Sequence, residues 1–261
     1  MELSSRSERL MGTTITVSIF HTLADEILAQ CFEILRSYEH RFSANDASSE
    51  LMEVNHQAGI APVRVHPDLF ELIALGTQHS QAKNSHLNIA IGPLVQTWRI
   101  GFSDARRPRQ EEIDQALTKI DPQQIQLDPE NHTVFLKRSG MKIDLGALAK
   151  GYSADLIGAF LKDQGITDAL IDLGGNILTV GQHPIKQQPW RIGIQNPVGK
   201  RGQHLLVLSV KNKSIVTSGI YERHLEVDGQ SFHHIFDSAT GYPVETDLAS
   251  ITIISDRSVD G

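Results

Sequence analysis

Two adjacent histidines and a cluster of turn-forming residues mark the stretch "SFHHIFDSATGYPVETD", residues 231–247. If "FHHIFD" forms a strand, His233 and His234 point to opposite faces, because side chains alternate along a strand. The two rings then cannot hold one metal ion together. A histidine facing a cleft can act as a general base near neutral pH, whereas a histidine in a core is more often a hydrogen-bonded structural residue. The stretch by itself leaves both interpretations open.

A second stretch, "KIDLGALAKGYSAD", predicts a strand that ends near Asp144, a glycine turn and then a helix. The free N–H groups at the start of such a helix can bind a phosphate, and Lys150 could add a positive charge there. The alternative is a capped structural helix with a solvated lysine. The sequence matches neither of the common glycine-rich nucleotide motifs, so both interpretations stay open here too.

Two glycine-containing stretches can approach a ligand closely or simply turn the chain. In "DLGGNILTVG", Gly174 and Gly175 favour a hairpin between two strands, and they also permit close backbone approach. In "LNIAIGPLVQTWRIGF", the Gly92–Pro93 pair should start a new element. The backbone around residues 88–90 then either lines a pocket or packs in the core.

The elements that must position these residues follow from hydrophobic periodicity and turn signals. Strands are predicted at residues 13–20 and in "QIQLD", "HTVFLKR", "MKIDLG", "DALIDL", "NILTVG", "WRIGIQ", "HLLVLSV", "SIVTSG", "RHLEV", "FHHIFD" and "ITIIS". Helices are predicted at residues 23–38, after the serines of "FSANDASSEL" through Asn55, from Pro67, within "RRPRQEEIDQALTKI" and at residues 147–162. Helices precede a mainly antiparallel run of strands, which predicts an α+β fold: one compact body of mixed and antiparallel sheets with packed helices.

Composition narrows the classes of function. The net charge is −7, from 24 basic and 31 acidic residues, and the longest basic cluster is the short "DARRPRQ". This disfavours binding to nucleic acid or to anionic membrane surfaces. No run of 18 apolar residues predicts a membrane span. The single cysteine, Cys31, excludes an intrachain disulfide and lies in a helical pattern, as a small core residue would.

Seven segments in order resemble the FAD:protein FMN transferase family, also called the ApbE family. They are "MGTTITV", "FSANDASSELMEVN", "NIAIGPLVQTW", "DLGALAKGYSAD", "ALIDLGGNILTVG", "VTSGIYER" and "HHIFDSATGYPV". The resemblance runs from about Met11 to the last strand. It implies an ApbE-like, T-fold-related α+β architecture, with residues 1–261 as a single flavin transferase domain.

The resemblance also implies a reaction. Such enzymes cleave the pyrophosphate of FAD, release AMP, and transfer FMN to a Ser or Thr hydroxyl of an acceptor protein, with Mg²⁺ required. His234 matches the family histidine that positions or deprotonates the acceptor hydroxyl, and Lys150 lies beside the flavin nucleotide. Ser238 stands where the family usually has proline, and Asp237 and Thr240 are expected to shape the turn through Asx-type hydrogen bonds.

The metal ligands implied by the resemblance are oxygen donors, as a hard cation requires. By position, one is the backbone carbonyl of Ala147. The acidic ligand of the family lies just beyond the last core strand and is followed four residues later by a threonine. Either Asp260 is this ligand, in a site that continues past Gly261, or the true ligand lies beyond Gly261. A final helix is expected there as well.

Flavin binding is expected at Met11, Asn45, Glu50, Asn88, Ile89, Ala90, Lys150 and Ile235. Many members carry a flavin-stacking aromatic residue where this chain has Asn45, and Asp-Pro-Thr where it has residues 88–90. Loss of a stacking ring costs about 1 kcal/mol of binding. Weaker or differently arranged FAD binding is therefore expected.

Two alternatives share the same scaffold. One is a flavin-nucleotide binding protein without transfer activity, and the other is a Mg²⁺-dependent FAD pyrophosphatase that gives FMN and AMP. For a transferase, the expected partners are FAD and an acceptor protein with a Ser or Thr flavinylation site, for example a membrane or extracytoplasmic redox protein. The polar N-terminus and the absence of a lipobox at Cys31 predict a cytoplasmic protein, although family members are often membrane-anchored lipoproteins.

Overall fold

The computed structural model describes residues 2–200 and 202–261. Its helices are α1 (Ala24–Phe42), α2 (Glu50–His56), α3 (Pro67–Gln81), α4 (Gly92–Trp98), α5 (Gln110–Leu117) and α6 (Ala149–Asp163), with two 3-10 turns, η1 (Pro122–Gln124) and η2 (Ser258–Asp260). Its strands are β1 (Ser4–Leu10), β2 (Thr13–Ile19), β3 (Val63–Arg64), β4 (Ile125–Asp128), β5 (Thr133–Leu136), β6 (Ala169–Leu173), β7 (Asn176–Val180), β8 (Trp190–Gln195), β9 (His204–Val210), β10 (Ser214–Gly219), β11 (His224–Val227), β12 (Gln230–His233) and β13 (Ser250–Ser255). The predicted α+β class is confirmed.

Contacts divide the chain into two compact units, and each is described by itself. Unit 1 holds residues 1–39, 148–219 and 248–261, and unit 2 holds residues 40–147 and 220–247. The prediction of one domain over residues 1–261 stays a prediction. Within the described residues, no helix is long and apolar enough to cross a membrane.

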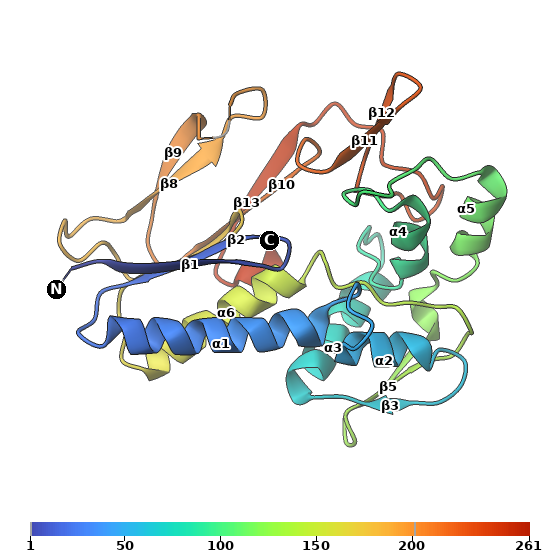
Figure 1. The fold of residues 1–261 in the computed structure, drawn as a ribbon, viewed down its shortest axis with the longest axis horizontal. Helices are drawn as coiled ribbons and strands as arrows, with labels where there is room; N and C mark the ends of the chain where they lie inside the picture. The colour runs from blue at the N-terminus through green and yellow to red at the C-terminus, as the bar shows by residue number, and fades with distance from the viewer. Residues whose placement is uncertain (1, 201) are drawn as a thin grey trace. The chain divides into compact units, whose positions relative to one another are not determined.

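Unit 1 is built on an antiparallel sheet in the order β1-β2-β6-β7-β10-β13. Helices α1 and α6 lie side by side against it (Figure 1). Their shared core includes Ile15 and Val17 from β2, Phe32 from α1, and Ile157 and Leu161 from α6, all fully buried. Each such side chain contributes about 1.5–3 kcal/mol on burial. This core holds the middle and the C-terminal half of α6 against the sheet.

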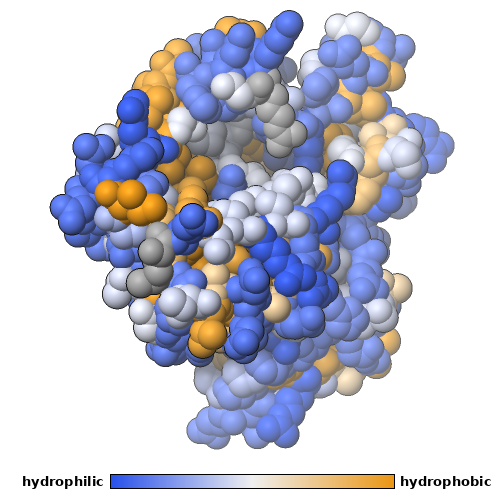
Figure 2. Space-filling view, turned by 60° about the vertical axis from the view of Figure 1, so that its left-hand side comes forward, coloured by the Kyte–Doolittle hydropathy of each residue, from blue (hydrophilic) through white to orange (hydrophobic). Residues whose placement is uncertain are grey.

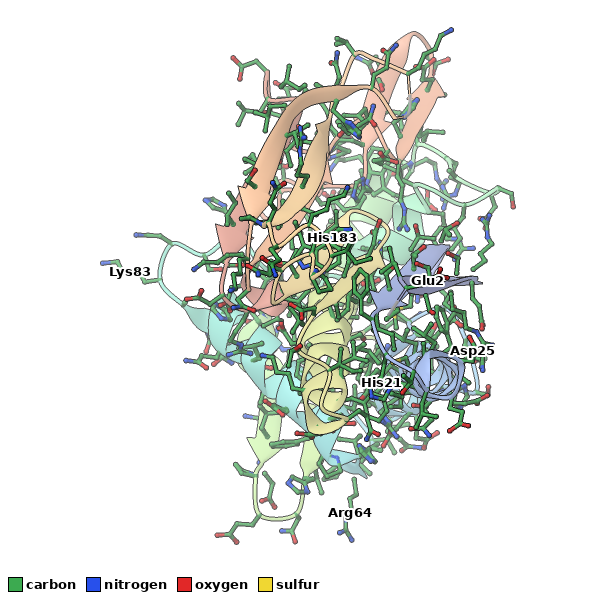
Figure 3. All side chains as sticks on the ribbon, turned by 90° about the vertical axis from the view of Figure 1, so that its left-hand side faces the viewer. Glu2, His21, Asp25, Arg64, Lys83 and His183 are labelled. Carbon is green, nitrogen blue, oxygen red and sulfur yellow. The ribbon has the colours of Figure 1, made fainter. Side chains whose placement is uncertain are left out.

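Cys31 belongs to this core, as expected. It is fully buried, and burial raises the pKa of its thiol to about 12. Exposed charges mark the other side of α1: Asp25 points to solvent at the start of the helix (Figure 3). An acidic residue there also suits the positive end of the helix dipole.

The second sheet of unit 1 is the β8–β9 pair, whose Trp190, Ile192 and Ile194 form a separate core with Phe20 and Ile215. Hydrophilic side chains cover much of the face shown in Figure 2, and hydrophobic side chains gather there in smaller patches.

Strand β1 was not predicted from the sequence. Its sequence, "SSRSERL", alternates between half-buried and exposed polar residues at the edge of the sheet. Side-chain hydrogen bonds with β2 replace the usual apolar signal, with Ser5 Oγ 2.7 Å from Ser18 Oγ and Ser7 Oγ 2.8 Å from Thr16 Oγ1.

Unit 2 contains helices α2 to α5, the three-stranded antiparallel sheet β3-β5-β4 and the β11–β12 hairpin. In Figure 3, Arg64 extends outward from β3, where its side chain is exposed. Trp98, at the end of α4, is fully buried among Ile113 from α5 and Phe232, Phe236 and Tyr242. This aromatic core includes side chains of the histidine-containing stretch and packs that stretch against α4 and α5.

The predicted strand in "MKIDLG" is wrong. Apart from one isolated bridge between Ile91 and Lys142, the segment is irregular. The backbone groups of Ile143 bond to a side chain instead of a neighbouring strand: its N–H donates to Asn55 Oδ1 at 2.7 Å, and its carbonyl accepts from Asn55 Nδ2 at 3.0 Å. One buried asparagine therefore takes the place of a ladder partner.

The predicted strand in "FHHIFD" is right only in its first part. Strand β12 ends at His233. After His233 the chain folds back on itself across the following turn. The N–H of Asp237 donates to the carbonyl of Tyr242 at 2.8 Å, and the N–H of Val244 donates to the carbonyl of Ile235 at 2.9 Å. His234 therefore lies at a strand end and not inside a strand.

Candidate functional site

The first group of site residues lies in unit 1, where the start of α6 meets the turn η2. We call this region the C-terminal corner: residues 149–155 of α6 and Ser258–Asp260. Gly151 makes the contact possible, because a Cβ there would lie 2.5 Å from the carbonyl oxygen of Ser258. Lys150, one residue earlier, is half-buried in the first turn of the helix.

Asp155 joins the two parts of the C-terminal corner. Its Oδ1 accepts from Ser258 N–H at 2.7 Å and its Oδ2 from Val259 N–H at 3.0 Å. Burial raises the pKa of this carboxyl, and the two N–H donors offset part of that rise. Sequence reasoning missed Asp155 as a functional residue, because no local pattern reveals a bond to backbone about a hundred positions later.

Asp260 presents a bare carboxylate at the C-terminal corner. It is exposed, and within the described chain no ion pair or side-chain hydrogen bond is recorded for it. The predicted carbonyl ligand, Ala147, belongs to unit 2 and is also exposed. No group of three or more His, Cys, Asp or Glu side chains in the described residues could hold a metal. The Asp260 carboxylate and the Ala147 carbonyl are both oxygen donors of the kind that Mg²⁺ takes. Mg²⁺ usually binds through few carboxylates and keeps several water ligands.

Met11 lies in the turn between β1 and β2, with a positive φ of 51°. Its N–H donates to Glu39 Oε1 at 2.6 Å, so a side chain of α1 holds the turn. Beside it, the predicted β6–β7 hairpin is confirmed, with Gly174 and Gly175 both at positive φ. Gly174 faces Thr13 so closely that a Cβ would lie 2.1 Å from Thr13 Oγ1. The two turns therefore form one end of the sheet.

The second group of site residues lies in unit 2. We call residues 233–244, from the end of β12 to the turn beyond, the histidine loop. His233 is buried, with Nε2 2.8 Å from the carbonyl of Val244 and Nδ1 accepting from Ile235 N–H at 3.2 Å. Both ring nitrogens are thus used by backbone groups of the loop, which makes His233 a structural residue.

His234 is half-buried, and its Nδ1 lies 3.2 Å from the carbonyl oxygen of Arg223. A carbonyl can only accept, so this contact favours the proton on Nδ1. In the neutral ring the lone pair is then on Nε2, as a general base requires. Ile235, next in the chain, is partly exposed and carries the loop's apolar surface.

The turn of the histidine loop is confirmed as predicted. Asp237 Oδ1 accepts from Ala239 N–H at 2.9 Å, and its Oδ2 accepts from Thr240 Oγ1 at 3.2 Å. The indole Nε1 of Trp98 donates to the carbonyl of Gly241 at 2.9 Å and ties the turn to the aromatic core.

Residues 88–90 lie beside the histidine loop. Asn88 Nδ2 donates to the carbonyl of Ile120 at 2.8 Å and to Ser238 Oγ at 3.4 Å. The side chains of Ile89 and Ala90 are buried, so these two residues can present only backbone groups to a ligand.

Asp144, which sequence reasoning placed only as a strand end, is tied to the same segment. Its N–H donates to the carbonyl of Ile89 at 2.8 Å. Burial raises the pKa of its carboxyl, while the N–H of Gly146 and the charge of Arg223 act in the opposite direction. A half-buried carboxylate with a raised pKa, within reach of the charge of Arg223, is thus a site feature that only the structure reveals.

Asn45 and Glu50 lie in and after the turn that follows α1. Asn45 is exposed, and its N–H donates to Ser43 Oγ at 3.1 Å. The carboxylate of Glu50 contacts Arg41 at 3.2 Å and accepts a short hydrogen bond from the backbone of His66. Its present contacts are structural, and a role in flavin binding stays a prediction.

Comparison with known proteins identifies the family of the chain. The ApbE family model matches residues 11–261. Proteins named FAD:protein FMN transferase from Klebsiella pneumoniae and Treponema pallidum are 41% and 38% identical, over 98% of this chain and 79% and 75% of their own lengths. The crystal structure of the ApbE protein from Thermotoga maritima is 26% identical and superposes with a TM-score of 0.90 over 99% of this chain and 84% of its own. The chain belongs to the ApbE family.

Proposed function

We propose that this protein is a Mg²⁺-dependent transferase that moves FMN from FAD to a Ser or Thr hydroxyl of an acceptor protein and releases AMP. The similarity to proteins named FAD:protein FMN transferase supports the reaction class. The observation that carries the proposal to this chain is the contact between Nδ1 of His234 and the carbonyl of Arg223, which favours a neutral ring with its lone pair on Nε2.

In the proposed reaction, the acceptor hydroxyl oxygen attacks the phosphorus of the FMN half of FAD. His234 Nε2 takes the hydroxyl proton, a phosphoester bond forms, and the bond from phosphorus to the AMP oxygen breaks. General base catalysis of this kind contributes about 10²–10⁴-fold in rate. Arg223 keeps the imidazole oriented throughout, because its carbonyl holds Nδ1–H.

The remaining charge is that of the pyrophosphate. Lys150, in the first turn of α6, is proposed to offset it as a fixed cation. The Ala147 carbonyl and the Asp260 carboxylate are the proposed metal ligands, and a bound Mg²⁺ would stabilise the charge on the phosphate oxygens.

The flavin-nucleotide contacts are proposed from the backbone groups of Ile89 and Ala90, the amide of Asn88, and the side chains of Met11 and Ile235. Asn45 and Glu50 complete this set as proposed contacts of the loop after α1. An asparagine at position 45 offers no ring for stacking, which favours weaker FAD binding than in relatives with an aromatic residue there.

The test is to incubate the protein with FAD, Mg²⁺ and an acceptor domain, and to analyse protein and nucleotides by mass spectrometry. We expect the acceptor to gain the mass of FMN at a Ser or Thr side chain, with one AMP released per transfer. Free FMN and AMP without labelled acceptor would instead identify a pyrophosphatase. Intact FAD bound to the protein would identify a binding protein, and either outcome would overturn the proposal.

A further inference from the structure

The carboxylate of Asp155 binds two backbone N–H groups of η2. Its two carboxylate oxygens accept from the successive N–H groups of Ser258 and Val259, at 2.7 Å and 3.0 Å. The first N–H groups of a helical turn have no partner within the turn, so a carboxylate from elsewhere in the chain satisfies them as an N-cap does. Because both residues are buried, water cannot take over these bonds without opening the turn.

The side chain of Ser258 is held separately, by hydrogen bonds to side chains of two strands. Its Oγ accepts from Asn176 Nδ2 at 2.5 Å and lies 2.9 Å from Ser214 Oγ, and all three residues are buried. Asn176 begins β7 and Ser214 begins β10. Two strands and a helix therefore converge on one serine, whose carbonyl also packs against Gly151.

Asp260 follows two residues after this serine. Its N–H donates to the carbonyl of Arg257 at 3.3 Å, and its exposed carboxylate makes no ion pair or hydrogen bond with the described residues. The position of its carboxylate is therefore set by the backbone to which it is attached. A ligand on a backbone that is already ordered avoids the entropy cost of ordering it on binding.

We infer that Asp155 is a positioning residue: by holding the N–H groups of Ser258 and Val259, it orders the turn that presents Asp260 to the metal. The inference rests on the proposed function only for the role of Asp260 as a metal ligand. The ordering of the turn by Asp155 is a property of the protein without metal, and it can be measured separately.

The first experiment measures amide hydrogen exchange of residues 255–261 in metal-free full-length protein. Asp155→Asn keeps one acceptor oxygen and should speed exchange at Ser258 and Val259 about tenfold. Asp163→Asn, at the exposed end of the same helix, is the matched control and should leave this exchange unchanged. Unchanged exchange at Ser258 and Val259 in Asp155→Asn would overturn the inference.

The second experiment measures Mn²⁺ binding by electron paramagnetic resonance, without FAD. Loss of a residue that orients a metal ligand typically weakens affinity 10–100-fold, so we expect Asp155→Asn to need about tenfold more Mn²⁺ for half-saturation. Ser258→Ala loosens the same turn without changing the charge, and should weaken binding in the same direction. Faster exchange with unaltered Mn²⁺ affinity in both variants would contradict a positioning role.

A third variant separates the inference from the proposed function. Asp260→Ala should abolish Mn²⁺ binding while leaving exchange at Ser258 and Val259 slow. If Asp260→Ala binds Mn²⁺ as the unmodified protein does, the metal role of Asp260 fails and the positioning role fails with it, although the ordering of the turn stands. With excess Mg²⁺, Asp155→Asn should regain FAD turnover, whereas Asp260→Ala should not.

Discussion

The C-terminal corner and the histidine loop are ordered in different ways. In the corner, Asp155, Asn176 and Ser214 reach η2 from 103, 82 and 44 positions away in the sequence. In the histidine loop, most bonds join residues 2 to 11 positions apart, and distant side chains, those of Trp98, Asn88 and Gln110, add anchors. The corner therefore depends on the whole of unit 1, whereas the loop largely orders itself.

The two regions show that different functional groups need different kinds of support to stay ordered. A histidine that must keep one tautomer needs only a nearby carbonyl, which the turn of the chain supplies. A carboxylate that binds a cation must keep its oxygens free of other partners. Its position must therefore be fixed by the backbone to which it is attached. Four predictions test this contrast, in order of decreasing effect.

The largest effect is expected in the histidine loop. His234→Ala removes the proposed base and should lower flavin transfer at least 100-fold with little change in thermal stability. His233→Ala should do the reverse, lowering stability by about 1–3 kcal/mol because the carbonyl of Val244 and the N–H of Ile235 lose a buried partner. Single-turnover transfer assays and thermal denaturation measure the two effects. Equal loss of activity in both variants would refute the assignment.

The anchor of the loop gives the next effect. Trp98→Phe removes the bond to the carbonyl of Gly241 and part of a fully buried ring, and should cost about 2–3 kcal/mol of stability. The matched control is Trp190→Phe in unit 1, whose indole also donates to a backbone carbonyl, that of Val180. Denaturant unfolding should show similar losses in both, and only Trp98→Phe should slow flavin transfer. Equal slowing by both would mean that the anchor is not specific to the loop.

The corner is tested by Gly151→Ala. The new Cβ would meet the backbone of Ser258 and Val259 at 2.5–2.7 Å, so η2 must move, at a cost of about 1–3 kcal/mol. In the same helix, Ser153 is fully buried and its hydroxyl has no hydrogen-bond partner in the described structure, so Ser153→Ala should be neutral or slightly stabilising. Calorimetry together with Mn²⁺ affinity distinguishes the two. A corner that tolerates Gly151→Ala without loss of Mn²⁺ affinity would contradict the role given to its close packing.

The smallest effect belongs to an exposed, local contact that provides a baseline. Arg106 and the N–H of Arg109 lower the pKa of Glu112 to about 2 at the start of α5. A carboxyl with a lowered pKa stabilises the fold above its unfolded pKa and loses that contribution as the pH falls to its folded pKa. Glu112→Gln should therefore lower the melting temperature slightly at pH 7, and the difference should vanish between about pH 4.5 and 2. A difference that persists at pH 2 would contradict the ionic origin.

Much of the local structure could be predicted from the sequence. The long helix around Cys31, the helix starting at Pro67, the β6–β7 hairpin at Gly174 and the Asx turn at Asp237 all arise from short-range patterns, and the structure confirms them. The failures have one cause. Strand β1 pairs with β2 through polar residues without an apolar pattern, and the segment around Ile143 bonds to the side chain of Asn55, so hydrophobic periodicity reports neither.

The sequence was enough to identify the family and the fold class and to suggest a set of candidate site residues, because these depend on residue types and their order along the chain. The resemblance singled out His234, and the tertiary structure adds the physical reason: both ring nitrogens of His233 bond to backbone groups of the loop, whereas Nδ1 of His234 meets the carbonyl of Arg223. It also revealed Asp155 and Asp144, whose environments are made by residues far away in the sequence. Burial and hydrogen-bond partners are properties of the packed chain, and they determine which candidate residues have the environment that their proposed role requires.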